Sequence, residues 1–321
     1  MRIANGSHGS KWMASFFFVA FVALVAAGCA KPVPYVTNVV VDADVRGCSP
    51  EAVGLSGGLD VAIIIDTSQS TRRPSGIDVD RDGRIPAFRG NSTIERGDSR
   101  LAAQIAALRP LIQSAAGLDI RFSVVTYAGA SGVRTTGKSA NSGTSSETQT
   151  RARLTKDTRR LNRVLDDVLS RGSNGTTVFF AGMQQGSRTL LANRSGGRRR
   201  VALFLSDASR PTGIVADTSI LAGNPATRRA ADPRMKKAAV LAKGQQIVFH
   251  TFGLSPESGA WRHHALGQIA GATGGSYHPV EDASSFYCHL VDALVPASPD
   301  REIDRAFARA RRNSEVANRT E

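Results

Sequence analysis

The sequence predicts an α/β protein with a doubly wound, mostly parallel sheet, one antiparallel edge strand and helices on both faces. Runs of apolar residues typical of strands alternate with segments in which apolar residues recur at helical spacing. Such alternation favours a sheet whose two faces are both covered by helices. It extends over residues 48–296, which is enough chain for one domain with a sizeable core.

The predicted domain begins with a buried strand and a long helix. Residues Leu59–Ile65 are apolar except for one aspartate, so they are expected to form a strand inside the sheet. An insertion follows at 71–97. Residues 98–115 carry apolar side chains along one helical face, and Asp98 or Ser99 can cap the start of this helix.

The next segment predicts the antiparallel edge of the sheet. Residues 118–127 contain alternating apolar side chains and are expected to form a strand. A loop rich in serine and glycine at 130–147 separates this strand from a second one at 148–154. Arg151 and Arg153 alternate along the second strand, and charged side chains suit an edge strand that must not pair with other chains.

The second half of the domain continues the alternation. Apolar residues at helical spacing between 161 and 169 predict a helix, which Gly172 can end. A turn, another helix and a strand at 201–205 come next. The remaining elements are expected at 235–243 (helix), 246–252 (strand), 261–270 (helix), 276–279 (strand) and 283–294 (helix).

The N-terminus has the pattern of an export signal. Arg2 and Lys11 form a basic start, and the stretch 14–28 is uncharged and almost wholly apolar. A membrane-spanning helix needs about 20 apolar residues, and this stretch is shorter. We therefore interpret residues 1–28 as a signal peptide.

The end of that segment, Ala26-Ala27-Gly28-Cys29, resembles the bacterial lipobox. The resemblance implies that Cys29 is acylated and that residues 29–47 are a tether to the membrane. In a cell with two membranes, Ala30 after the cysteine favours the periplasmic face of the outer membrane. Cleavage by an ordinary signal peptidase and an uncleaved anchor are the alternatives. The charged tail 297–321 has almost no apolar residues and is expected to be disordered.

The chain is strongly basic, with a formal net charge of +14. Such a charge is compatible with nucleic acid or with a membrane surface as partner. The basic residues are scattered, apart from the run 198–200, and they lack the interleaved aromatic residues of single-strand binders. In an exported protein this favours a solvated basic surface and no nucleic-acid partner.

The pattern D-x-S-x-S follows the first predicted strand directly. Asp66, Ser68 and Ser70 place one carboxylate and two hydroxyls at the edge where an α/β sheet presents its ligands. These hard oxygen donors suit Mg²⁺ better than a soft metal. Three donors are too few for a six-coordinate ion, and Thr177 and Asp207 are expected at the same edge.

Together these residues resemble the metal-ion-dependent adhesion site of the von Willebrand factor A family, whose domain is Rossmann-like. That family carries D-x-S-x-S after the first strand, a threonine in a turn before a later helix, and an aspartate ending the fourth strand. Thr177 is the better match for the threonine, with Thr176 as the alternative, and Asp207 matches the aspartate. The resemblance covers residues 48–296.

The resemblance implies a protein-binding module and not an enzyme. Mg²⁺ or Mn²⁺ would be held by five residues, Asp66, Ser68, Ser70, Thr177 and Asp207, and an acidic side chain of a protein ligand would complete its coordination. One alternative is a structural envelope scaffold or assembly factor whose metal only stabilises the fold. In another, the hydroxyls merely cap helices. A metal-dependent hydrolase has little support, because the sequence offers no clear general base.

The insertion carries a second acidic pattern. Residues 78–85 match the start of an EF-hand loop, in which Asp78, Asp80 and Asp82 would bind Ca²⁺. The loop's twelfth position is arginine instead of the bidentate glutamate, and Glu95 or Asp98 could substitute. The alternative is an exposed acidic turn without an ion.

The chain has three cysteines. If Cys29 carries lipid, Cys48 and Cys288 remain as a pair in an oxidising compartment. Some members of the von Willebrand factor A family, which the chain resembles, join the two ends of the domain by such a bridge. A disulfide closing so long a loop could contribute about 4–5 kcal/mol in the chain-entropy model. Two unpaired buried thiols are the alternative.

Overall fold

The structure, a computed structural model, describes residues 58–86, 96–129, 148–192, 196–207, 233–254, 262–280 and 285–295. All of these belong to one compact unit, Val39–Glu321. The predicted signal peptide, the tether, Cys29, Cys48, the loop 130–147 and the tail 297–321 lie outside the described residues. Among the residues that are described, no helix combines the length and the apolar character that crossing a membrane requires.

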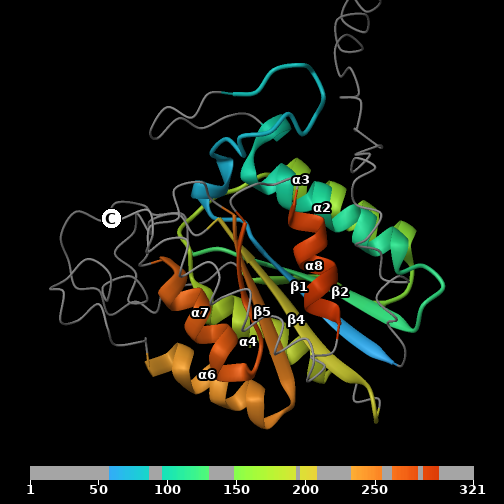
Figure 1. The fold of residues 1–321 in the computed structure, drawn as a ribbon, viewed down its shortest axis with the longest axis vertical. Coiled ribbons are helices and arrows are strands. Elements are labelled where there is room, and N and C mark those ends of the chain that lie inside the picture. Colours follow the sequence, from blue (N-terminus) through green and yellow to red (C-terminus); the bar gives the residue numbers. More distant parts are fainter. Residues whose placement is uncertain are drawn as a thin grey trace, which may run out of the picture. The chain divides into compact units, whose positions relative to one another are not determined.

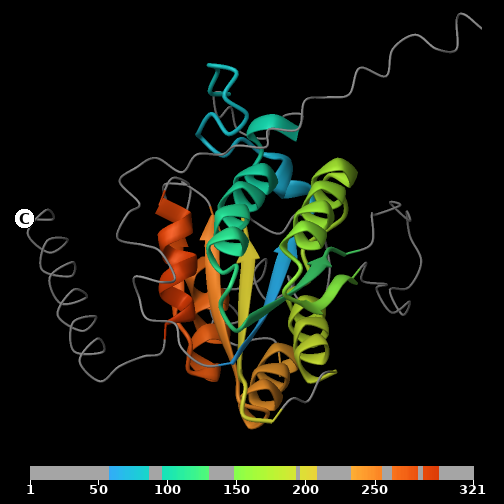
Figure 2. The same ribbon diagram turned by 90° about the vertical axis from the view of Figure 1, so that its right-hand side faces the viewer.

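The centre of the domain is a six-stranded sheet in the order β3-β2-β1-β4-β5-β6. Four of its neighbouring pairs are parallel, and only β2 and β3 are antiparallel. Figures 1 and 2 show the long parallel strands with their arrowheads at one edge. The strands are β1 (Leu59–Asp66), β2 (Ile120–Tyr127), β3 (Gln149–Thr155), β4 (Arg199–Ser206), β5 (Ile247–Leu254) and β6 (Tyr277–Val280). The predicted doubly wound α/β fold, with its antiparallel edge strand, is confirmed.

Helices cover both faces of this sheet, as the apolar spacing predicted. Short 3-10 turns, η2 and η3, flank the insertion between β1 and α2. The described helical elements are η2 (Gln69–Arg72), η3 (Arg96–Asp98), α2 (Arg100–Ser114), α3 (Thr158–Arg171), α4 (Phe179–Leu191), α6 (Pro233–Gly244), α7 (Arg262–Thr273) and α8 (Phe286–Leu294).

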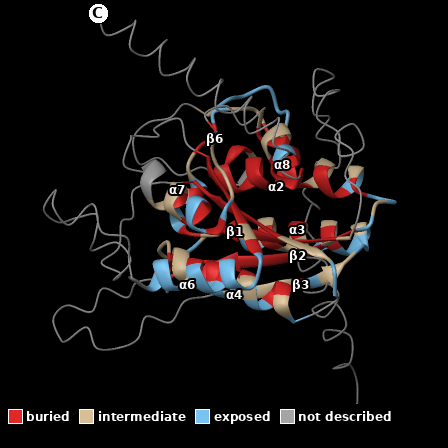
Figure 3. Ribbon diagram, turned by 60° about the horizontal axis from the view of Figure 1, so that its bottom comes forward, coloured by how far each residue is buried: buried red, intermediate tan, exposed pale blue. Residues whose placement is uncertain are grey.

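Two apolar cores lie on opposite faces of the sheet. Along β1, Val61, Ile63 and Ile65 join the core under α2, α3 and α8, whereas Ala62 and Ile64 join the core under α4, α6 and α7. Successive side chains of a strand point to opposite faces, so two covered faces require consecutive apolar residues, as at residues 61–65 of β1. Figure 3 shows the resulting buried centre between exposed outer helical surfaces.

Local signals set the ends of several elements. Ser99 caps α2, because its Oγ accepts a hydrogen bond from Ala102 N at 3.1 Å. The helix therefore begins at Arg100, and Asp98 belongs to the 3-10 turn before it. Gly172 ends α3 with a φ of 69°, as the sequence predicted. The other observed boundaries lie within a few residues of the predicted ones.

Candidate metal centre

The strand order reverses between β1 and β4, which lie side by side at the centre of the sheet. In open α/β sheets, ligands bind at the carboxyl ends of strands at such a switch point. Asp66 is the last residue of β1, and Asp207 directly follows β4. Both carboxylates are buried, at 0% and 1% exposure. The topology therefore brings together two acidic residues that are far apart in the chain.

Hydroxyl groups link these two ends of the sheet in a continuous row. Thr177 Oγ1 donates to Ser68 Oγ at 2.9 Å, and Ser68 Oγ lies 3.1 Å from Ser70 Oγ. Ser70 Oγ then donates to Asp207 Oδ1 at 3.1 Å. Asp66 joins the cluster through its Oδ1, which accepts the backbone N–H of Ser68 at 2.8 Å. All five predicted site residues thus lie in one cluster.

Backbone hydrogen bonds hold the two turns of this cluster against each other. Gln69 N donates to Gly175 O at 2.9 Å, and Asn174 N donates to Thr67 O at 2.8 Å. Thr67 N in turn donates to Tyr127 O at 3.0 Å, which ties the D-x-S-x-S turn to the end of β2. Gly175 has a φ of 81°, a conformation that glycine adopts at little cost. These backbone hydrogen bonds between the two turns place Thr177 next to Ser68.

The structure distinguishes between the two candidate threonines. Thr177 Oγ1 reaches Ser68, whereas Thr176 Oγ1 is buried next to Gly129 and has no hydrogen-bond partner within the described part of the chain. Helix capping does not account for the hydroxyls either. Ser68 precedes η2 without capping it through its side chain, and the residue preceding α4 is Val178.

Burial and neighbouring charges shift the pKa values of two groups in the cluster. Burial, together with the nearby charge of Asp207, raises the pKa of Asp66 from 3.8 to about 7. Burial and the charge of Asp66 also raise the pKa of Tyr127 well above its ordinary value. Two buried carboxylates beside three hydroxyls form an all-oxygen donor set, which fits a hard divalent cation. The residues present therefore fit the ion that the sequence resemblance implies.

Three further residues support the cluster and were not predicted. Ser206 Oγ donates to Asp66 Oδ2 at 2.9 Å, and Tyr127 OH donates to Leu205 O at 3.2 Å. Arg100 Nη1 lies 3.3 Å from Asp207 Oδ2, with the arginine side chain fully buried. Arg100 could have been suspected from its spacing, because it stands four and eight residues before the buried Gln104 and Leu108 on the same helical face. For Ser206, the only signal in the sequence was its position next to Asp207.

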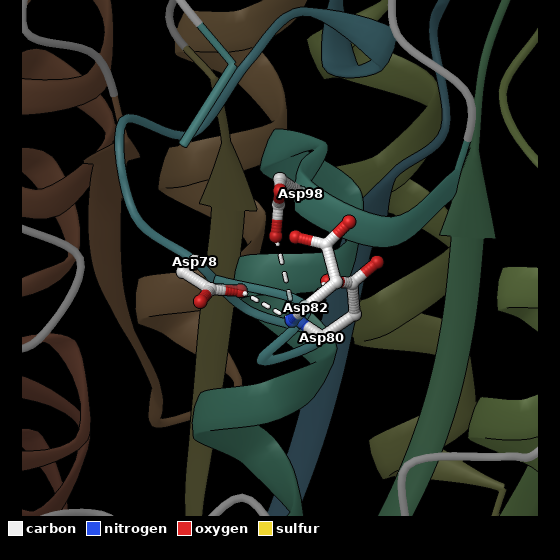
Figure 4. Close-up of side chains that lie close together, drawn as sticks. All are labelled: Asp78, Asp80, Asp82 and Asp98. Atoms are coloured by element: carbon white, nitrogen blue, oxygen red, sulfur yellow. Dashed lines mark hydrogen bonds between the residues drawn. The ribbon is translucent and has the colours of Figure 1, made fainter. Parts of the chain in front are cut away.

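The acidic residues of the insertion form a separate cluster (Figure 4). Its four carboxylates can each place an oxygen within 4.8 Å of the others, and they belong to Asp78, Asp80, Asp82 and Asp98. The sequence had offered Asp98 as one possible replacement for the missing glutamate. Glu95, the other, lies outside the described residues.

Backbone N–H groups occupy several oxygens of this acidic cluster. Asp98 Oδ1 accepts from Val79 N at 2.6 Å and from Asp80 N at 3.3 Å. Asp78 Oδ2 accepts from Gly83 N at 3.0 Å, which closes the turn of the loop. Burial raises the pKa of Asp98, and the charges of Asp80 and Asp78 add to the effect. Asp78 and Asp80 are half-buried and Asp82 is exposed, so these carboxylates are accessible to solvent.

Arg100 joins the acidic insertion to the first cluster. Its Nε donates to Pro74 O at 3.3 Å, and its backbone N donates to Arg73 O at 2.9 Å. Pro74 also forms an isolated antiparallel bridge with Ser99. The start of the insertion is therefore fixed to the start of α2, directly behind Asp207.

Cys288 lies in α8 and is disulfide-bonded. Because Cys48 lies outside the described residues, its pairing with Cys288 stays a prediction. The same holds for acylation of Cys29.

No protein-family model matches the chain. No curated protein matches it either. Solved structures that resemble it include BatB from Bacteroides thetaiotaomicron, a conserved hypothetical protein, at 14% identity, with 74% of this chain and 97% of that chain covered and a TM-score of 0.48. The SpRpn10 VWA domain is 12% identical, with 73% and 95% covered and a TM-score of 0.45. The PilB minor pilin from Streptococcus sanguinis is 13% identical, with 74% and 61% covered and a TM-score of 0.49.

Proposed function

We propose that this chain is an exported, lipid-anchored binding module of the von Willebrand factor A type in the bacterial cell envelope. It recognises an acidic side chain of a protein partner through Mg²⁺ or Mn²⁺. The observation that carries the proposal is the hydrogen-bonded row at the switch point of the sheet, which gathers residues from three separate segments. These residues are Asp66, Ser68, Ser70, Thr177 and Asp207.

The charges of the cluster suit such a partner. Asp66 and Asp207 together carry two negative charges when ionised, and Arg100 carries one positive charge. A bound divalent cation would leave this group with a net charge of about +1 by formal count, which a carboxylate from the partner would neutralise. Neutral hydroxyls donate weakly, so the ion would keep an electrophilic position for that carboxylate.

We propose binding without turnover. Both oxygens of Asp66 accept hydrogen bonds, from Ser68 N and Ser206 Oγ, and both oxygens of Asp207 are paired, with Ser70 and Arg100. Each carboxylate oxygen keeps a second lone pair after it accepts one hydrogen bond, so both groups can still coordinate an ion. A general base must lie within hydrogen-bond reach of the proton that it removes, and the sequence resemblance implies a bound partner carboxylate at this site and not a reacting group.

The proposal is tested by calorimetry and thermal unfolding of the full chain in mild detergent, made metal-free and then titrated with Mg²⁺ or Mn²⁺. We expect saturable binding and a rise in Tm, both lost in Asp66→Ala. Asp167→Ala, which removes an exposed acid on α3 outside both clusters, is the matched control and should respond like the parent chain. Absence of any response to Mg²⁺ or Mn²⁺ in the parent chain would refute the proposal.

The main alternative is a scaffold whose metal only stabilises the fold. A pull-down from envelope extract, in Mg²⁺ and in chelator, distinguishes the two functions. If the metal mediates recognition, a partner captured by the parent chain is lost both in chelator and with Asp66→Ala. If the metal is structural, the folded fraction of Asp66→Ala retains that partner.

We also propose that the lipid anchor is on Cys29, as the lipobox-like sequence before it suggests. Labelled palmitate should be incorporated into the parent chain in a bacterial host and not into Cys29→Ser. Equal labelling of both chains would rule out this acylation site.

A second site, for Ca²⁺, is proposed at the acidic loop. It is supported by the convergence of Asp78, Asp80 and Asp82 with Asp98, the last residue of η3. Four carboxylates this close repel one another, and a hard cation would relieve that repulsion. Because the loop is open to solvent and lacks the bidentate glutamate of an EF-hand, we expect modest affinity and a structural role.

A further inference from the structure

Arg100 occupies an unfavourable position for a cation. It is the first residue of α2, where the helix dipole places partial positive charge, and its side chain is 0% exposed. The first turn of α2 contains no acidic residue to offset this. Burying an arginine costs free energy unless a nearby anion and hydrogen-bond acceptors compensate for it. The buried Arg100 therefore needs a specific anionic partner.

That partner is Asp207, one of the candidate metal ligands. Arg100 Nη1 lies 3.3 Å from Asp207 Oδ2, while Ser70 Oγ donates to the other oxygen, Oδ1, at 3.1 Å. Asp207 thus uses one oxygen toward the hydroxyl row and the other toward the arginine. Arg100 Nε donates to Pro74 O, which fixes the guanidinium from the insertion side. The arginine therefore contacts Oδ2 of this carboxylate, and Oδ1 contacts the hydroxyl of Ser70.

The charges of Asp66, Asp207 and Arg100 indicate the role of the arginine. Asp66 and Asp207 are two buried carboxylates that are linked to each other through Ser68 and Ser70. Arg100 places a positive charge against one member of this pair, Asp207. We propose that Arg100 is a positioning residue that serves as the built-in counter-cation of the site, keeping Asp207 in place and the site folded when no metal is bound. This inference rests on the proposed metal-binding function.

The inference predicts how the stability of the protein depends on Arg100 and on the metal together. A bound divalent cation would also neutralise the charges of Asp66 and Asp207, so the arginine and the metal would stabilise the same two carboxylates. Removing the arginine should therefore harm the metal-free protein much more than the metal-loaded protein. A residue that acted only by packing would stabilise both states equally.

The test compares the Tm of the full chain, with and without saturating Mg²⁺, in the parent chain and in Arg100→Met. Methionine keeps much of the apolar stem and removes the charge. We expect the metal-free Tm to fall by roughly 6–12 °C, as for a broken buried ion pair in a domain of this size. Saturating Mg²⁺ should restore at least half of that loss, so the metal-induced rise in Tm is larger in Arg100→Met than in the parent chain.

Two further variants sharpen the test. Arg100→Lys retains the charge, and its metal-induced rise should stay close to that of the parent chain. Arg109→Met removes another arginine of α2, one that pairs with Asp166 away from the site, and should lower Tm equally with and without metal. The inference is overturned if Arg100→Met shows the same metal-induced rise as the parent chain, or if it stays unfolded at saturating Mg²⁺. If the parent chain responds to neither Mg²⁺ nor Mn²⁺, the proposed function itself fails.

Discussion

Thr177 Oγ1 donates a hydrogen bond to Ser68 Oγ at 2.9 Å, although the two residues are 109 positions apart in the chain. The contact exists because the turn before α4 is bound by backbone hydrogen bonds to the turn after β1. It joins the turn that carries the threonine to the D-x-S-x-S turn, which are two of the three parts of the predicted adhesion site. The neighbouring Thr176 makes no such contact, so the pair offers a matched comparison.

Thr177→Ala should weaken binding of Mg²⁺ by about tenfold or more, because it removes one oxygen from the cluster. Thr177→Ser keeps the hydroxyl and should bind nearly as well as the parent chain. Calorimetric titration of the metal-free protein measures all three affinities. Thr176→Ala is the control, and if it weakens Mg²⁺ binding more than Thr177→Ala does, the assignment of the threonine is wrong.

The stability of the metal-free protein should depend on pH through Asp66. Burial and the charge of Asp207 raise its pKa from 3.8 to about 7, so the folded state holds the proton more tightly than the unfolded state. The stabilisation from this proton is complete below about pH 4 and is lost as pH rises through about 7. Between pH 4 and pH 8, Tm of the parent chain should fall as the pH rises and this stabilisation is lost. That part of the fall should be absent in Asp66→Asn.

Saturating Mg²⁺ should reverse that pH dependence. The ion requires the ionised carboxylate, so its stabilising effect should grow as the pH rises toward 8. Tm curves with and without Mg²⁺ should therefore separate with increasing pH. Curves that remain parallel from pH 5 to 8 would show that Asp66 does not take part in binding the ion.

Gly275 lies close to the backbone of β5. A Cβ atom at this position would lie 1.9 Å from Phe249 O, so the backbone itself would have to move. Gly275→Ala should destabilise the domain by about 1–3 kcal/mol, measured by urea unfolding. Gly271 lies in α7 with open space around it, and Gly271→Ala should be neutral or stabilising because alanine favours helix. Equal losses in both variants would contradict this packing argument.

Asp98 should be as important for Ca²⁺ as the aspartates of the loop. Its Oδ1 accepts hydrogen bonds from the backbone N–H groups of Val79 and Asp80. Its carboxylate also lies close to the carboxylates of the three loop aspartates. Asp98→Asn and Asp80→Asn should each remove most of the Ca²⁺-induced rise in Tm while the Mg²⁺ response persists. Asp167→Asn is the control on α3. An unchanged Ca²⁺ response in both loop variants would leave the cluster as an acidic turn without an ion.

The sequence predicted the sheet and most of its helices because their signals are local. The apolar run 61–65 in β1 and the apolar side chains at helical spacing in α2 and α3 follow directly from which faces must be buried. Capping and turn signals placed ends such as Gly172 correctly. The choice between Asp98 and Ser99 as the cap of α2 remained open, since both residue types cap helices and only the fold sends Asp98 to the acidic cluster.

By itself, the sequence determined the fold class and the candidate ligands Asp66, Ser68, Ser70 and Asp207, because these follow from strand ends and from a recognisable spacing. Only the tertiary structure shows that the hydroxyl of Thr177 contacts Ser68, whereas the hydroxyl of Thr176 is buried and makes no hydrogen bond within the described residues. It alone brought Arg100 behind Asp207, 107 positions away. A sequence pattern records which side chains are available, but the free energy of burying a charge depends on the partner that the packed fold places within a few ångströms of it.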